Sequence, residues 1–320
     1  MSGGAKIPVR VAEVVTVNAL IKRFRFVARD GSDLPAFSGG AHVVVEMDDA
    51  GTRRLNPYSL MSDPSDRSGY EISVRRDDQG RGGSLFLHTH VTAGMEMVIS
   101  HPMNLFALDN RARKHLMIAG GIGITPFLAQ IKQLARFNGA FELHYAARNP
   151  ALAAYADALK ATHGGKVNLY FDDDGQQIPL ADLLSRQPLG THLYVCGPKG
   201  MLNWVRQTAV KCGWPEHAVH FEEFLAPQPG KPFDVELTVT GKTIHVTETQ
   251  SLLEAMEAAG VDAPYLCRGG ACGQCETRVV RCDGELLHRD HWLSPEEHAE
   301  GTKIMPCVSR FDGRALAIER

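Results

Sequence analysis

The first hundred residues alternate between short hydrophobic runs and turn residues, a pattern typical of β-strands. Five such runs lie between residues 8 and 101: Val9–Val17, Ile21–Ala28, His42–Met47, Tyr70–Arg75 and Met95–Ile99. Strands this short and this closely spaced predict a small antiparallel barrel or sandwich.

From Lys114 onward the pattern changes to an alternation of strand, helix and strand. The segments that carry it are His115–Ala119, the amphipathic Pro126–Phe137, Phe141–Ala146, Val167–Phe171 and Leu193–Cys196. This alternation predicts a parallel sheet covered by helices. The change of pattern falls near Asp109, where we expect a domain boundary.

A second boundary is indicated by composition and charge together. Residues 226–232 read Ala-Pro-Gln-Pro-Gly-Lys-Pro, which is typical of an interdomain linker. The residues after this stretch, 233–320, carry 15 acidic and 9 basic side chains, whereas residues 1–232 are slightly basic. The sequence therefore predicts domains at 1–109, 110–225 and 233–320, with a linker at 226–232.

The overall composition narrows the class of protein. A net charge of -3, with 44% hydrophobic and 22% charged residues, excludes large-scale disorder and a strongly basic nucleic-acid binder. No apolar run reaches the roughly 18 residues that a membrane-spanning helix needs, so we expect no membrane partner. The N-terminal segment MSGGAKIPVR lacks a hydrophobic signal region, so we expect a cytoplasmic protein. Cysteine clusters in that compartment usually bind metal or catalyse reactions.

Five of the seven cysteines gather near the C-terminus. The spacing Cys267-x4-Cys272-x2-Cys275, followed by Cys307, matches the plant-type pattern for a [2Fe-2S] cluster held by four thiolates. The glycines between the first three cysteines allow tight turns and let backbone N–H groups point at the cluster sulfurs.

Two alternatives remain open at this cysteine cluster. Four thiolates also suit zinc, although zinc sites usually use two close Cys-x2-Cys pairs and here three ligands share one loop. Cys282 competes with Cys307 as fourth ligand, but it follows Val279-Val280-Arg281 in an expected strand and is more simply a packed thiol.

Two segments of the expected parallel sheet are candidates for nucleotide binding. The strand ending at Ala119 runs into Gly120-Gly-Ile-Gly-Ile-Thr-Pro126 and then a helix, with Thr125 as the expected N-cap. The strand ending at Cys196 runs into Gly197-Pro198. Ligands in open parallel sheets bind beyond the carboxyl ends of the strands, so both turns can border one cleft. Either turn can also be purely structural.

Two segments of the N-terminal domain also have functional character. Asn56-Pro-Tyr-Ser59 offers an aromatic face and a hydroxyl donor, and Gly80-Arg-Gly-Gly-Ser84 offers a flexible basic loop suited to phosphate. Two histidine-rich spots, His88-x-His90 and His288-x2-His291, lack further ligands at a recognisable spacing. We therefore expect no metal there.

Taken together, these motifs resemble the phthalate dioxygenase reductase family, flavin–iron-sulfur reductases of the ferredoxin–NADP reductase-like superfamily. The motifs are Tyr58-Ser59, Gly80–Ser84, Gly120–Pro126, Cys196-Gly-Pro198, His220-Phe-Glu-Glu-Phe224 and the cysteine quartet. The resemblance covers nearly the whole chain and implies a multidomain fold. Its parts are an antiparallel β-barrel flavin domain, an α/β parallel-sheet nicotinamide domain and a C-terminal α+β β-grasp ferredoxin domain.

The resemblance also implies the cofactors, the partner and the site residues. The expected cofactors are FMN, NADH and a [2Fe-2S] cluster, and the expected partner is a Rieske-type terminal oxygenase. The expected catalytic residues are Ser59, Thr125, Cys196 and Glu222. Cofactor contacts are expected at Asn56, Pro57, Tyr58, Ser59, Ser73, Val74, Arg75, Arg81, Gly82, Gly83, Ser84, Gly120, Gly121, Gly123, Thr125, Pro126, Arg148, Cys196, Gly197, Pro198 and Phe224.

One position departs from the family. Its flavin motif is Arg-x-Tyr-Ser, but Asn56 stands where the arginine belongs. Arg54, Arg75 or Arg81 can supply the missing charge instead. Arg148 lies where a nicotinamide enzyme meets a 2′-phosphate, and the family nevertheless favours NADH over NADPH.

Two other functions compete with the oxygenase reductase. A self-sufficient flavin oxidoreductase needs a substrate domain, and we expect the chain to be too short for one. The sequence also shows no Rieske Cys-x-His pairs. A redox sensor that signals the state of its cluster to a partner needs no hydride site, whereas this sequence carries flavin and nicotinamide motifs.

Overall fold

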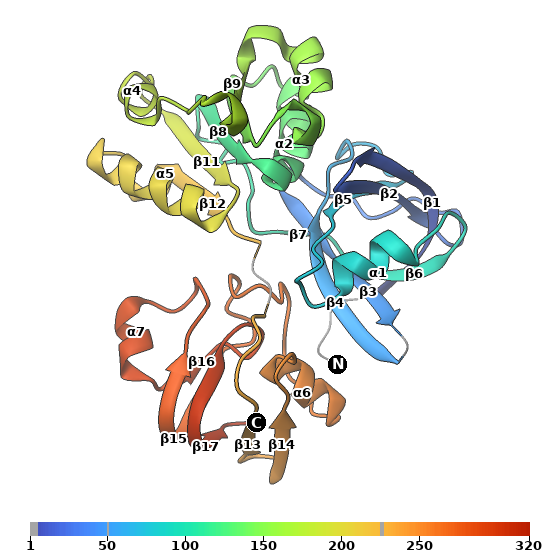
Figure 1. Ribbon diagram of the computed structural model, residues 1–320, viewed down its shortest axis with the longest axis vertical. Coiled ribbons are helices and arrows are strands. Elements are labelled where there is room, and N and C mark those ends of the chain that lie inside the picture. Colours follow the sequence, from blue (N-terminus) through green and yellow to red (C-terminus); the bar gives the residue numbers. More distant parts are fainter. Residues whose placement is uncertain (1–5, 50, 225–226) are drawn as a thin grey trace. The chain divides into compact units, whose positions relative to one another are not determined.

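The computed structural model describes residues 6–49, 51–224 and 227–320 (Figure 1). The chain divides into two compact units, one of Ile7–Arg54 with Tyr58–Glu223 and the other of Lys6, Leu55–Pro57 and Phe224–Arg320. The first two domains expected from the sequence thus fall almost wholly within one unit. Ala226, where the expected linker begins, lies outside the described residues, and the exact domain boundaries stay a prediction.

An antiparallel sheet forms the first part of the larger unit. Its strands pair in the order β4-β3-β6-β1-β2-β5, with β7 on β3. The elements are β1 (Lys6–Asn18), β2 (Ile21–Ala28), β3 (Ala41–Asp49), β4 (Thr52–Ser59), β5 (Tyr70–Arg75), α1 (Gly83–Thr89), β6 (Glu96–Ser100) and β7 (Met103–Asn104). Alternate apolar residues such as Val9, Val11, Phe24 and Phe26 are buried together because successive strand residues face opposite sides of a sheet.

A five-stranded parallel sheet in the order β10-β9-β8-β11-β12 forms the rest of this unit. Met117 and Ala119 pack on one face while Leu116 and Ile118 pack on the other, so both faces are covered. The elements are β8 (Lys114–Gly120), η1 (Gly121–Ile124), α2 (Thr125–Arg136), β9 (Phe141–Ala147), η2 (Pro150–Leu152), α3 (Ala156–His163), η3 (Gly164–Lys166), β10 (Val167–Phe171), η4 (Asp172–Asp174), α4 (Leu180–Ser185), β11 (Thr191–Cys196), α5 (Lys199–Lys211), η5 (Glu216–Ala218) and β12 (Val219–Glu222).

The C-terminal unit contains a mixed sheet in the order β14-β13-β17-β15-β16, in which β13 and β17 are parallel and the other neighbouring strands are antiparallel. Helix α6 begins with a capping box between Ser251 and Glu254 and packs on this sheet. The elements are β13 (Phe233–Leu237), β14 (Lys242–Val246), α6 (Leu252–Ala258), β15 (Thr277–Leu287), α7 (Pro295–Glu300), β16 (Lys303–Ile304) and β17 (Arg310–Ile318). Antiparallel, parallel and mixed sheets in this order confirm the expected fold class.

Two local expectations from the sequence were wrong. Thr125 is not an N-cap, because helix α2 already includes it and Ile124 precedes the helix; the Thr125 hydroxyl donates to the Ile122 carbonyl at 3.0 Å instead. The segment Gly80–Ser84 is only partly a loop, since Gly83 and Ser84 open helix α1. Among the described residues, no helix is both long and apolar enough to cross a membrane.

Candidate functional site

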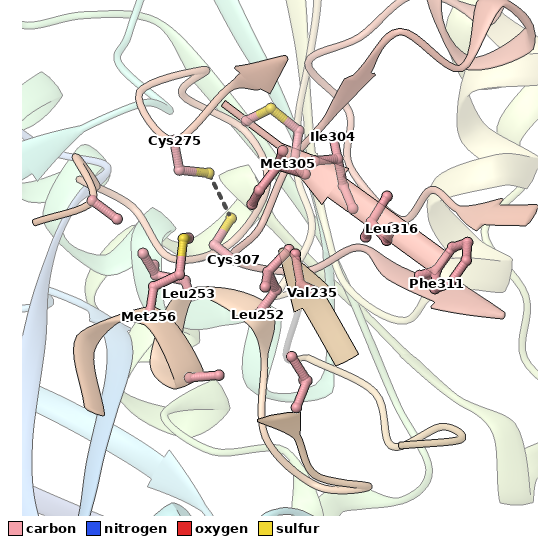
Figure 2. Packing of buried hydrophobic residues seen from close by; sticks show 14 of the residues in the cluster. Val235, Leu252, Leu253, Met256, Cys275, Ile304, Met305, Cys307, Phe311 and Leu316 are labelled. Atoms are coloured by element: carbon pink, nitrogen blue, oxygen red, sulfur yellow. Dashed lines mark hydrogen bonds between the residues drawn. The ribbon is translucent and has the colours of Figure 1, made fainter. Parts of the chain in front are cut away.

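The four predicted cluster ligands come together in the C-terminal unit. Cys275 Sγ lies 3.3 Å from Cys307 Sγ, and Figure 2 shows the two side chains pointing at each other. Interaction with the Cys272 thiol, helped by backbone N–H groups, lowers the pKa of Cys267 to about 5, and Cys307 likewise lowers the pKa of Cys275. The site thus holds two thiol pairs, and in each pair one thiol is more acidic than its partner. The thiolate is the form of cysteine that suits iron.

Backbone shape at the cysteine loop depends on two glycines in the left-handed region. A side chain at Gly270 (φ 71°) would lie 2.7 Å from Val308, and one at Gly273 (φ 73°) would overlap the ring of Trp292. Only glycine fits either position, so the loop N–H groups can approach the sulfurs. This cradle fits a [2Fe-2S] cluster.

Cys282, the competing ligand, lies elsewhere in its domain. It is exposed on strand β15, and its thiol points at the Gly284 carbonyl, 3.5 Å away. Cys307 by contrast is buried beside Cys275. The geometry therefore favours Cys307, and Cys212 is partly exposed at the end of helix α5.

Arg268, which the sequence did not single out, fixes the other side of the cysteine loop. Arg268 is only 5% exposed. Its guanidinium donates to both carboxylate oxygens of Glu257 on α6, at 2.9 and 2.5 Å, and lies over the Tyr265 ring with its central carbon 4.3 Å from the ring centroid. Its backbone adopts φ 53°, which is rare outside glycine. A paired and stacked guanidinium thus anchors the residue that follows Cys267.

The carboxyl ends of β8 and β11 meet in the larger unit. A side chain at Gly123 would lie 2.3 Å from the Cys196 carbonyl oxygen, and one at Gly120 would lie 2.7 Å from Pro198. Strand order reverses between β8 and β11, with β9 on one side and β12 on the other. This is the topological switch point, where open α/β sheets bind their ligands.

Three predicted catalytic residues lie near one another at this edge. Cys196 is fully buried and pairs in register with Glu222. Burial raises the pKa of the Cys196 thiol well above its usual value, and the Glu222 carboxylate acts in the same direction. Burial raises the pKa of Glu222 to about 8, with the nearby Ser59 hydroxyl acting in the opposite direction. Ser59 Oγ and Glu222 Oε2 are buried and fall short of hydrogen-bonding geometry. Two unsatisfied polar atoms beside a switch point are what a bound cofactor would satisfy.

The predicted phosphate-binding segments also lie together. Arg54 on β4 donates to the Arg81 carbonyl, and Asp49 holds its guanidinium at 3.1 Å. A side chain at Gly82 would lie 3.0 Å from the guanidinium carbon of Arg54, which is closer than an ordinary van der Waals contact. Arg54 shares a strand face with Asn56 and Tyr58, because side chains alternate along a strand. Arg75, another candidate for the missing charge, is exposed at the end of β5.

Several predicted contacts are engaged within the protein or lie apart. Ser73 Oγ is hydrogen-bonded to the Tyr155 hydroxyl at 2.5 Å, and the Val74 carbonyl accepts from the His88 ring. Ser84 Oγ accepts from the Asp77 N–H. Arg148 is exposed just after β9, one strand away from the switch point, and Phe224 begins the other unit with 48% of its surface exposed.

Known proteins resemble the chain over its whole length. The domain family described as 2Fe-2S iron-sulfur cluster binding domain matches residues 235–312, and the one described as dimethylamine monooxygenase subunit DmmA-like, N-terminal domain, matches residues 97–219. The carnitine monooxygenase reductase subunit of Acinetobacter baumannii is 43% identical, covering 98% of this chain and 97% of the relative. The heme-dependent oxidative N-demethylase beta subunit of Ectopseudomonas mendocina is 44% identical over 97% of this chain and 98% of the relative.

A solved structure supports the same grouping. The structure described as phthalate dioxygenase reductase, a modular structure for electron transfer from pyridine nucleotides to [2Fe-2S], superposes with a TM-score of 0.87 at 33% identity. The match covers 99% of this chain and 98% of that one.

Proposed function

The chain belongs to the family of oxygenase reductase subunits that includes phthalate dioxygenase reductase, and on that premise we propose that it carries electrons from NADH, through FMN and a [2Fe-2S] cluster, to a Rieske-type terminal oxygenase. The observation that carries the proposal is the presence, in one chain, of a four-cysteine cradle and of a parallel sheet with a topological switch point. The cytoplasmic location stays a prediction from the sequence.

The C-terminal cradle supplies the outlet for single electrons. Cys267, Cys272, Cys275 and Cys307 would hold the cluster, and the glycine loop would direct N–H groups at its sulfurs. When bound, FMN lets a two-electron hydride donor serve a one-electron acceptor.

The switch point would orient the reactants of hydride transfer. Gly120 and Gly123 let the turn after β8 pack closely against Cys196 and Pro198, which brings the carboxyl ends of β8 and β11 together where a nicotinamide would bind. Glu222 stays protonated below about pH 8 and can both donate and accept a hydrogen bond, while Ser59 offers a hydroxyl beside it. In hydride transfer these residues would position the reactants and would not act as an acid or a base.

The flavin phosphate would be held by the segment around Gly82. Arg54 brings a fixed positive charge to this loop and replaces the arginine that the family carries at the position of Asn56. Asp49 fixes the planar guanidinium, whose remaining N–H donors would then meet a phosphate in a set geometry.

The proposal is tested by the absorbance of the purified protein during titration with NADH. We expect flavin bands overlapping iron-sulfur absorption, bleached by NADH and restored by an acceptor. Cys307→Ser should lose the iron-sulfur absorption and keep hydride transfer to flavin, while the matched variant Cys282→Ser should keep both. A protein that binds zinc alone would disprove the proposal, and loss of the cluster in Cys282→Ser only would reverse the ligand assignment.

The type of oxygenase has a second candidate. The 44% identical relative is named as the beta subunit of a heme-dependent N-demethylase, so a haem protein is an alternative acceptor to a Rieske centre. NADH-driven turnover with a purified Rieske oxygenase and, separately, with a haem-containing demethylase subunit distinguishes them. The higher kcat/KM identifies the acceptor class. Rapid NADH consumption with a small-molecule substrate and no partner would favour the self-sufficient oxidoreductase.

A further inference from the structure

A tryptophan lies directly on the cysteine loop and faces solvent. The indole of Trp292 covers Gly273 so closely that any side chain there would overlap its ring, yet 51% of Trp292 is exposed. Moving a large aromatic side chain out of water lowers the free energy, so an exposed one can gain by being covered. An exposed indole on the loop between Cys272 and Cys275 is therefore a candidate for contact with another molecule.

Three hydrogen bonds hold this indole in place. The His291 N–H donates to the Gly270 carbonyl at 3.0 Å, and the Leu293 N–H donates to the buried Asp290 carboxylate at 2.9 Å. The indole N–H itself donates to Glu276 at 3.0 Å. Trp292 is thus fixed on both sides along the chain and at its ring, and a preorganised side chain loses little entropy on binding.

The exposed indole lies on the most open side of the cysteine cradle. Cys272, next to Gly273, is partly exposed, whereas the other three cysteines of the quartet are buried. Leu266, directly before Cys267, is also 39% exposed. The cysteine of the quartet that lies nearest to solvent is thus the direct neighbour of Gly273, which the indole covers.

Acidic groups lie beside the exposed indole. Lys303 contacts Glu276 at 3.2 Å and Glu297 at 2.6 Å, so two carboxylates share one ammonium group beside the indole. The domain as a whole has six more acidic than basic residues. A partner with basic residues around an apolar centre is complementary to this surface.

We propose that Trp292 is the anchor on which a protein electron acceptor docks, and that this acceptor presents an apolar pocket within a basic rim. The proposal rests on the function proposed above. One electron leaves by the Cys272 side, the iron-sulfur group is oxidised by one electron, and the metal centre of the acceptor is reduced by one. No bond or proton is exchanged. Electron-transfer encounters have small interfaces, so one central aromatic side chain carries much of the affinity.

The test uses the full-length protein with its cofactors, NADH as donor and cytochrome c as acceptor, since cytochrome c is a basic haem protein. In Trp292→Ala we expect the KM for cytochrome c to rise by about 5- to 30-fold. Reduction of ferricyanide, which needs no docking surface, should keep its rate. Trp292→Phe keeps an aromatic ring but loses the hydrogen bond to Glu276. Its KM for cytochrome c should lie between those of the wild type and Trp292→Ala.

Val280→Ala is the matched control, because Val280 is 53% exposed on strand β15 of the same unit. Its KM should equal that of the wild type. An unchanged KM in Trp292→Ala overturns the proposal, and so does slower bleaching of the cluster by NADH in a single turnover. If Trp292→Ala loses its cluster absorption, the KM of Trp292→Phe decides instead.

The failure of the proposed function would look different. Wild-type protein whose cluster NADH does not bleach, or Cys307→Ser protein that reduces cytochrome c at the full rate, would show that electrons do not leave through the cluster. Normal bleaching with an unchanged KM in Trp292→Ala would reject the docking site alone.

Discussion

The buried carboxyl group of Glu222 gives the candidate hydride site a pH dependence. Burial raises its pKa from 4.5 to about 8. Between these values the folded protein keeps a proton that the unfolded chain loses. The free energy of unfolding therefore falls as the pH rises through this range and levels off above pH 8.

We predict that Glu222→Gln removes this contribution, because a glutamine does not ionise. Wild-type stability should fall relative to the variant by up to about 1 kcal/mol per pH unit between pH 5 and 8. Thermal unfolding of both proteins across this range measures the difference. Glu216→Gln, an exposed glutamate before β12, is the control and should run parallel to the wild type. Parallel curves for Glu222→Gln would show that its carboxyl group is not proton-bound at neutral pH.

Single residues were predictable from the sequence where the chemistry depends on local spacing. The four cysteines gather as expected, since three of them lie in one loop of nine residues. Ser73 was expected to contact a cofactor, and the structure joins its hydroxyl to Tyr155, 82 positions later. A pairing across that distance depends on how two sheets pack, which no local pattern encodes.

Helix α6 and the cysteine loop are joined by the buried ion pair of Glu257 and Arg268. Both guanidinium N–H contacts are made, at 2.9 and 2.5 Å, and the arginine is almost wholly buried. Removing one partner of such a pair leaves a charge without compensation in a site of low dielectric. The pair therefore links the stability of a helix to the shape of the metal-binding loop.

We predict that Glu257→Ala destabilises the C-terminal domain by about 3–5 kcal/mol and speeds loss of the cluster. The rate at which iron-sulfur absorption decays in moderate urea measures this. Glu236→Ala is the matched control, because Glu236 pairs with Arg281 at 3.0 Å but both side chains are about half exposed. The control should change stability by at most about 0.5 kcal/mol. Equal decay rates in the two variants would contradict the role given to the buried pair.

Elements were predictable where hydrophobic residues follow a regular period. Strands β2 and β5 have the bounds expected from the sequence, Ile21–Ala28 and Tyr70–Arg75. The sequence pattern predicted no strand at β4, and it predicted a loop at Gly83 and Ser84, which open helix α1. Two-residue strands such as β7 are too short for any period.

At the scale of the molecule, the domains differ in net charge as clearly as they differ in fold. The C-terminal domain, residues 233–320, has 15 acidic and 9 basic residues, while the rest of the chain is slightly basic. Uneven charge of this kind does not determine a fold, but it accelerates encounters with partners of opposite charge. The acidic domain is the one that contains the four-cysteine cradle, so the charge surrounds the expected point of electron exit.

We predict that electron delivery to a basic protein acceptor is sensitive to salt. Raising the ionic strength from about 0.01 to 0.15 M shortens the Debye length from about 30 to 8 Å, so attraction over longer distances is lost. The kcat/KM for cytochrome c should then fall by roughly tenfold. Stopped-flow reduction at a fixed NADH concentration measures it.

The sign of the effect can be checked with an acceptor of opposite charge. Ferricyanide is a small anion that the acidic domain repels, so screening should leave its reduction unchanged or speed it up. A similar fall for both acceptors would mean that salt acts on NADH binding or on hydride transfer rather than on encounter. If the kcat/KM for cytochrome c did not change with ionic strength, the apolar contact at Trp292 would be left as the source of affinity. The two contributions are separable because charge acts mainly on the association rate, whereas loss of the indole acts mainly on dissociation.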